Sequence, residues 1–114
     1  MGLRSNLLRS DSSLEACLIS DPAHIIPGST GEHVSKIQIA LALVDQAAID
    51  SQEASHGLFG PTTKAAVLNF KRRRNIINWT YQTQVDDIVG RMTIRALDAE
   101  LTIKENGLTR LEWI

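Results

Sequence analysis

Apolar residues recur at helical spacing in three stretches of this chain, and no stretch with the alternation of a β-strand rivals them. Before the first stretch, Ser29 and Glu32 have the spacing of a capping box, and we expect this helix to end near residues 46–48. Its apolar face is formed by Val34, Ile37, Leu41 and Val44, widened by Ile39 and Leu43. We therefore predict that this helix is the most buried.

The second predicted helix runs from Pro61 to about Asn75. Gly60 suits its N-cap, because proline at the first helical position has a suitable φ and needs no N–H partner. The third helix begins at Gly90, and its pattern breaks at residues 104–107. The positions expected in the core are Ala66, Val67 and Phe70 on the second helix, and Ile94, Leu97 and Leu101 on the third.

The remaining segments lack this periodicity. Residues 1–11 are expected to form a loose terminus, and residues 12–19 a short helix that begins with a capping box of Ser12 and Glu15. Residues 50–57 and 76–87 are polar or irregular, and we predict that both are loops.

Two segments of the chain repeat each other thirty residues apart. Gly60, Thr63 and Ala66 align with Gly90, Thr93 and Ala96. Such a repeat indicates one structural unit used twice. We interpret the two Gly-x-x-Thr helix starts as structural, because glycine permits a close approach and threonine can satisfy a free N–H of the first turn.

The composition agrees with a helical domain. The chain has 114 residues, enough for one domain with one modest core. Aromatic residues make up only 4%, so the core must consist mainly of aliphatic residues and alanine, which favours helices. The net charge is −1, although residues 61–114 contain nine bases and six acids. A nucleic-acid-binding role therefore ranks last among the hypotheses.

The sequence predicts neither a metal site nor catalysis. His24, His33 and His56 are scattered, with no acidic residue at metal-motif spacing, and no nucleophile elbow is present. The single Cys17 is interpreted as a packing residue. We accordingly predict a protein that is not an enzyme and needs no cofactor.

No Sec signal peptide and no transmembrane helix is predicted, because the N-terminal residues lack an apolar core. Both export by a route other than Sec and a cytoplasmic location agree with this expectation.

Three segments resemble the peptidoglycan-binding domain family. Residues 31–41 resemble its first helix, G-x-x-V-x-x-I/L-Q-x-x-L, residues 57–70 its G-x-F-G-P-x-T-x-x-A-V-x-x-F segment, and residues 86–97 its D-G-x-V-G-P-x-T-x-x-A-L segment. At the motif positions this chain has Gly31, Gln38, Gly57, Phe59, Gly60, Pro61, Thr63, Ala66, Asp86, Gly90, Thr93 and Ala96. Asp87 and Arg91 stand where the family has glycine and proline.

The resemblance spans residues 27–101 and implies an all-α fold, a compact three-helix bundle. To this domain the chain adds an N-terminal extension with a short helix, residues 1–26, and an apolar C-terminal tail, residues 102–114. The implied function is non-catalytic binding to bacterial cell-wall peptidoglycan, through its glycan or its stem peptide. Some family members accompany type VI secretion effectors, so a cell-wall-active or secreted protein is an implied partner.

The residues expected to contact such a ligand are Trp79, Tyr81, Gln82, Gln84 and Arg72. Aromatic faces stack on sugars, amides bond to acetamido groups, and a guanidinium binds carboxylates. In the other interpretation, the two aromatic residues fold inward to fix a long loop, and the basic run 71–74 complements the end of its helix. Four consecutive helical residues point in different directions, so they cannot all address one ligand.

A protein-interaction adaptor is the alternative function. In this hypothesis the bundle is kept and the sugar site is lost. The apolar C-terminal tail and the exposed bases would then contact an effector or a secretion component.

Overall fold

The computed structural model describes residues 2–77 and 84–112, with side chains as far as residue 106 except that of residue 21. These residues form five α-helices and one short 3-10 helix, and they contain no β-strand. The elements are α1 (Ser12–Cys17), η1 (Asp21–Ala23), α2 (Glu32–Asp45), α3 (Ser51–His56), α4 (Pro61–Arg74) and α5 (Arg91–Glu112). The described part of the chain is all-α, as predicted.

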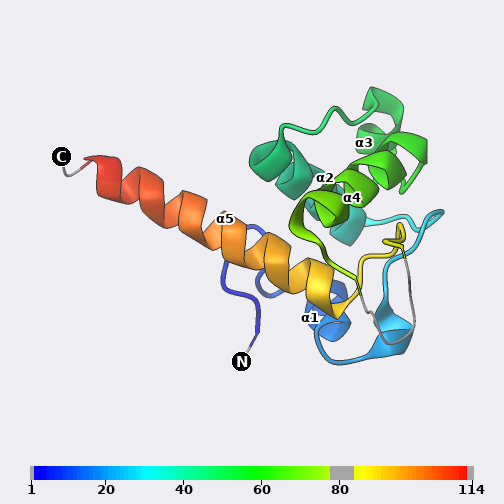
Figure 1. The fold of residues 1–114 in the computed structure, drawn as a ribbon, viewed down its shortest axis with the longest axis horizontal. Helices are drawn as coiled ribbons and strands as arrows, with labels where there is room; N and C mark the ends of the chain where they lie inside the picture. The colour runs from blue at the N-terminus through cyan, green and yellow to red at the C-terminus, as the bar shows by residue number, and fades with distance from the viewer. Residues whose placement is uncertain (1, 78–83, 113–114) are drawn as a thin grey trace.

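Helix α2 is the centre of the arrangement, because it packs against α3, α4 and α5. Helix α1 packs against η1 and α5. The C-terminal half of α5 extends away from the other helices, towards the end marked C (Figure 1). Two isolated bridges join the segments between helices, Ile25 to Val89 and Thr30 to Leu58.

One apolar core lies between these helices. The positions predicted for the faces of α4 and α5 are buried, and so are Val34, Ile37 and Leu41 of α2. The widening of the α2 face was wrong, because Ile39 is 49% exposed and Leu43 is 51% exposed.

The N-terminal segment is packed, so the prediction of a loose terminus at residues 1–11 was wrong. Leu3 and Leu8 are buried in the core. Carboxylates of the helices accept hydrogen bonds from the backbone of this segment. The bonds run from Leu3 N to Glu15, from Arg4 N and Ser5 N to Asp98, and from Asn6 N to Glu105.

Both predicted capping boxes were wrong. Helix α1 is capped by Asp11, whose Oδ1 accepts from Ser13 N and Leu14 N. Helix α2 begins at Glu32 after Gly31, which has φ of 140° and no side chain to cap the helix. The positive φ of Gly31 ends the extended segment abruptly, so the helix cannot begin at Ser29.

Two further predictions were wrong in opposite ways. Residues 50–57 contain α3, which Asp50 caps at its start and Gly57 ends with φ of 57°. Caps rather than an apolar stripe mark this short helix. Helix α5 continues through residues 104–107 to Glu112, because a single glycine costs a long helix only about 1 kcal/mol.

The bounds of α4 confirm the prediction for the second helix. Gly60 is its N-cap and Pro61 its first residue, and Asn75 ends it in the left-handed conformation with φ of 54°. The first turn carries no acidic residue of its own. The backbone N–H groups of this turn are satisfied from another helix.

The partner of this turn is the buried side chain of Glu53 on α3. Its Oε1 accepts from Gly60 N at 3.1 Å and from Thr63 N at 2.9 Å, and its Oε2 accepts from Thr62 N at 2.9 Å. The hydroxyls of Thr62 and Thr63 donate to the same carboxylate. One carboxylate from α3 therefore caps α4 with five hydrogen bonds.

Gln38 connects this cap to α2. Its side-chain nitrogen donates to Leu58 O at 2.9 Å and to Thr63 Oγ1 at 2.9 Å, and Gln38 is buried. Burial raises the pKa of Glu53, but the hydrogen bonds from Thr62 and Thr63 outweigh this effect and lower the pKa to about 2. Glu53 is therefore held as a carboxylate.

We expect Glu53→Gln to destabilise the protein by about 2 kcal/mol, because an amide nitrogen would face N–H donors that lose their acceptor. Glu32→Gln is the matched control, since Glu32 is exposed. Urea denaturation followed by circular dichroism measures both variants. Equal stability of the two would contradict the role given to Glu53.

The same cap predicts a pH dependence. The folded pKa of Glu53, about 2, lies below its ordinary value of 4.5, so this stabilisation is fully present above pH 4.5. It is lost as the pH falls from 4.5 towards 2. The free energy of unfolding of the wild type should therefore fall more steeply over this window than that of Glu53→Gln, and parallel curves would contradict the assignment.

Candidate functional site

The basic run at the end of α4 is the first candidate region, and its members point in different directions. Lys71 is buried and turns inward. Its Nζ lies 2.6 Å from Asp86 Oδ1 and donates to Ile88 O at 2.9 Å. Lys71 therefore anchors the segment that precedes α5, and it is not available to a ligand.

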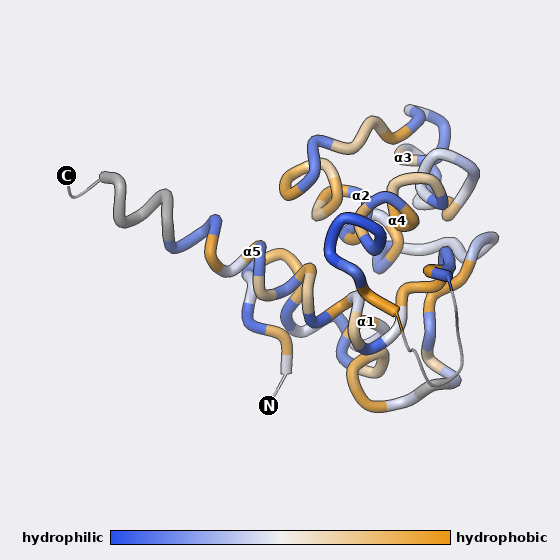
Figure 2. The backbone as a smooth tube through the Cα atoms, in the orientation of Figure 1, coloured by the Kyte–Doolittle hydropathy of each residue, from blue (hydrophilic) through white to orange (hydrophobic). Residues whose placement is uncertain are grey.

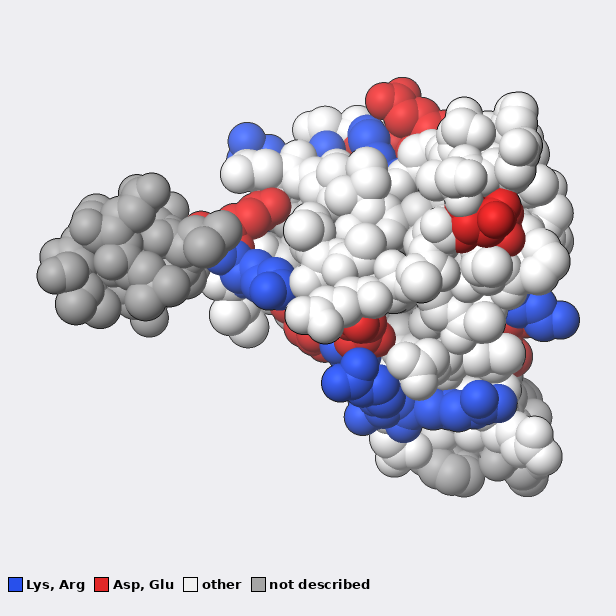
Figure 3. All heavy atoms as spheres, turned by 90° about the horizontal axis from the view of Figure 1, so that it is seen from above, with Lys and Arg blue, Asp and Glu red and all other residues white. Residues whose placement is uncertain are grey.

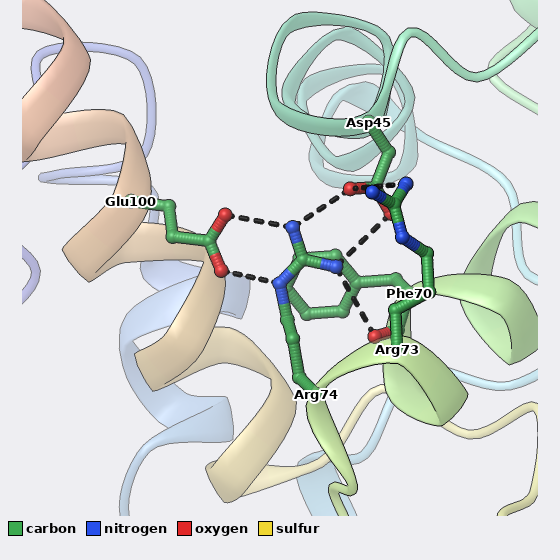
Figure 4. A network of polar contacts seen from close by, with 5 residues as sticks. All are labelled: Asp45, Phe70, Arg73, Arg74 and Glu100. Atoms are coloured by element: carbon green, nitrogen blue, oxygen red, sulfur yellow. Dashed lines mark hydrogen bonds and ion pairs between the residues drawn. The ribbon is translucent and has the colours of Figure 1, made fainter.

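Arg74 joins three helices (Figure 4). Its guanidinium donates to both carboxylate oxygens of Asp45 on α2 and to Glu100 on α5. It also lies over the ring of Phe70, 3.8 Å from the ring centroid. Hydrogen bonding to Glu100, opposed by burial and supported by Asp45, raises the pKa of Arg74.

The two remaining bases of the run are exposed. Arg73 Nη1 lies 3.4 Å from Asp45 Oδ1. Arg72 has no hydrogen bond or ion pair among the described residues. The four cations therefore differ in direction and in partners, as expected for consecutive residues of a helix. Basic side chains gather in a band along one edge of the face seen in Figure 3.

The segment after α4 is fixed at both ends. Ile76 and Ile77 are buried, and Figure 2 shows this hydrophobic segment directly after the strongly hydrophilic end of α4. At the other end, Asp86 accepts from Ile88 N and from Lys71. The candidates Trp79, Tyr81 and Gln82 lie outside the described residues. Gln84 is exposed.

Motif residues before α2 and before α4 lie together. Gly31 N donates to Gly57 O at 3.0 Å, and Phe59 N donates to Ser29 O at 2.9 Å. A Cβ on Gly57 would lie 2.7 Å from Gly31 O, which explains the glycine there. These contacts agree with a structural role for the motif residues.

Sequence reasoning missed a hollow between α1 and the start of α2. One lobe of about 330 Å³ is lined by Ser12, Ser13, Ala16, Ala23, His24, Ile25, Ser29 and His33. A second lobe of about 330 Å³ is lined by Ser10, Asp11, Ser12, Ser13, Glu32, His33 and Lys36. The two share Ser12, Ser13 and His33. Only the scattered histidines signalled this place in the sequence.

The described residues offer little else for chemistry. Cys17 is buried, its Sγ donates to Val89 O at 3.2 Å, and burial raises the pKa of its thiol to about 11. This agrees with its interpretation as a packing residue. The described residues contain no group of three or more side chains that could hold a metal ion.

No protein-family model matches the chain, and the searches of curated proteins and of solved structures found no match either. Among the helices of the described residues, none combines the length and the apolar character needed to cross a membrane.

The contrast within the basic run predicts a difference in stability. Arg74→Ala should cost about 2 kcal/mol, because Asp45 is almost fully buried and would lose its main partner. Arg72→Ala should change stability by less than about 0.5 kcal/mol. Thermal and urea denaturation of the two variants measures this. Similar losses in both would show that Arg74 does not join the helices.

Proposed function

We propose that this protein is a non-catalytic peptidoglycan-binding module on a three-helix bundle. The segments that resemble the family fall on α2, α4 and α5, in the family's order. The motif glycines Gly31, Gly60 and Gly90 each directly precede one of these three helices. This agreement between motif order and helix starts supports the resemblance, which rests on the sequence.

The observation that carries the binding site is the isolation of Arg72. Its three neighbours in the run are held by acidic residues, while Arg72 is exposed and unpaired among the described residues. In the sequence it precedes the aromatic candidate Trp79 by seven residues. An unpaired guanidinium, followed in the sequence by aromatic and amide residues, suits a polymer of acetylated sugars with carboxylate-bearing stem peptides.

Binding at such a site is weak for each contact. An exposed arginine and a surface segment desolvate little of a hydrated polymer. Retention on the wall then comes from the repeated sites of the polymer or from a linked partner.

One observation favours the adaptor as a second candidate. Ile39 and Leu43 lie one turn apart on α2, and each exposes about half of its side chain, 49% and 51%. A protein partner could cover this apolar pair. The proposal ranks second because nothing in the described residues defines the chemistry of that partner.

Co-sedimentation with purified peptidoglycan sacculi tests the proposed function. We expect the wild type to pellet with sacculi, Arg72→Ala to bind about tenfold more weakly, and Trp79→Ala/Tyr81→Ala to lose binding. Arg95→Ala is the matched control, since Arg95 is an exposed arginine on α5 without an ion pair among the described residues. Circular dichroism verifies that each variant is folded.

If the wild type does not pellet above a control protein, wall binding is wrong, and a pull-down with Ile39→Ser/Leu43→Ser as the negative control tests the adaptor. If Arg72→Ala and Arg95→Ala bind as the wild type does, Arg72 is not part of the site.

A further inference from the structure

Helix α5 carries a second apolar stripe, on the side that faces solvent. Met92 is 50% exposed and Ile103 is 69% exposed. Between them lie Ala99, which is exposed, and Ala96, which is partly buried. The four residues are spaced by four, three and four positions, which is the heptad spacing of two helices that pack along each other. Single exposed apolar residues need no partner, whereas this regular stripe has the pattern of a helix–helix contact.

The stripe is separate from the side of α5 that belongs to the core. That side carries the buried residues Ile94, Leu97 and Leu101, and α5 packs against α1 and α2. The C-terminal half of α5 extends away from the other helices (Figure 1). Helix α5 therefore has two apolar sides, and within the described residues its own domain buries only one of them.

The charges beside the stripe favour a second copy of this chain as its occupant. Arg95 and Glu100 are five positions apart and border the stripe on opposite sides. When two such helices run parallel and in register, residue 95 of each lies beside residue 100 of the other, as at the e and g positions of a coiled coil. In an antiparallel pair, the arginine side of one helix would face the arginine side of the other.

Both charges are accessible for this contact. Arg95 is exposed and has no ion pair among the described residues. Glu100 binds Arg74, yet 37% of its side chain remains exposed. A carboxylate has about four acceptor positions, so Glu100 can accept from a second guanidinium.

The sizes of the side chains along the stripe also fit a second copy. Two packed helices are closest where they cross and diverge to either side, so alanines suit the middle and larger residues the ends. Ala96 and Ala99 stand in the middle, and Met92 and Ile103 stand at the ends. The stripe spans only about 17 Å of helix, which is short for a permanent interface.

We propose that this protein forms a weak, parallel two-fold dimer through the outer side of α5. The stripe of each copy packs against the stripe of the other, and Arg95 of each copy pairs with Glu100 of the other. The dimer does not rest on the proposed function, because it forms in the free protein.

Sedimentation velocity of the full chain over a series of concentrations tests this proposal. We expect the mass to rise from that of a monomer to that of a dimer. Ala99→Glu should abolish the rise, since it places two carboxylates at the centre of the contact, and Ile103→Ser should weaken association at least about tenfold. The matched controls are Ala65→Glu, an exposed alanine on α4, and Ile19→Ser, which is 79% exposed outside the stripe. Circular dichroism verifies that each variant is folded.

Cross-linking tests the direction of the two helices. In a parallel pair, residue 99 of one copy faces residue 99 of the other, so Ala99→Cys should form an intermolecular disulfide when an oxidant is added. Cys17 is buried and does not compete. Cross-linking in a mixture of Met92→Cys and Ile103→Cys, without cross-linking of Ala99→Cys, would overturn the parallel arrangement.

Three results of sedimentation would overturn the dimer: a monomer at every concentration, assembly beyond two copies, or equal losses in the variants and their controls. Sacculus binding is measured below the concentration at which the copies associate, so Arg95→Ala stays a valid control there. A dimer that does not pellet with sacculi removes only the proposed function. A monomer that pellets removes only this inference.

Discussion

The capping of α4 by Glu53 is the contact on which the arrangement of the central helices depends. Helix α3 is too short to be stable alone, and its value lies in bringing one carboxylate to the N–H groups of another helix. The hydroxyl of Thr63 donates to this carboxylate and accepts from the side-chain amide of Gln38, so α2, α3 and α4 meet at a single threonine. Gly60 makes the approach possible, since a Cβ there would lie 2.7 Å from Cδ of Glu53.

The same chemistry holds the N-terminal segment against the helices. Asp98, Glu15 and Glu105 accept from backbone N–H groups of residues 3–6, while Leu3 and Leu8 enter the core. Carboxylates thus replace the backbone partners that a strand or helix would supply. This segment has no helix or strand, yet it packs against the core. Its backbone N–H groups are hydrogen-bonded to carboxylates, and its leucine side chains are buried.

Acidic residues also divide the basic run at the end of α4. Lys71 is committed to Asp86, and Arg74 to Asp45 and Glu100, so their charges stabilise the fold. Within the run, Arg72 is left exposed and without a partner among the described residues. Glycines, rather than ion pairs, shape the hollow near α1. There, a Cβ on Gly31 would come too close to the imidazole of His33, and a Cβ on Gly90 would come close to that of His24. Two motif glycines therefore lie against histidines that line the hollow, although the histidines are not part of the motif.

Local patterns determined the long helices of this protein. The apolar spacing and the Gly60–Pro61 start predicted α4 and the buried faces of α2, α4 and α5, because these depend on residues close in sequence. The cap by Glu53 and the packed N-terminus arose from contacts between different elements, such as Ser5 with Asp98, which no local pattern records. Helix α3 has local caps, but it lacks the apolar stripe on which the prediction relied. The candidate site divides in the same way. Arg72 was named from the sequence. That it is unpaired while its three basic neighbours are paired, and that His24 and His33 line one hollow, was decided by tertiary structure alone. The physical reason is that hydrogen-bond partners and ion pairs are assigned only when helices pack.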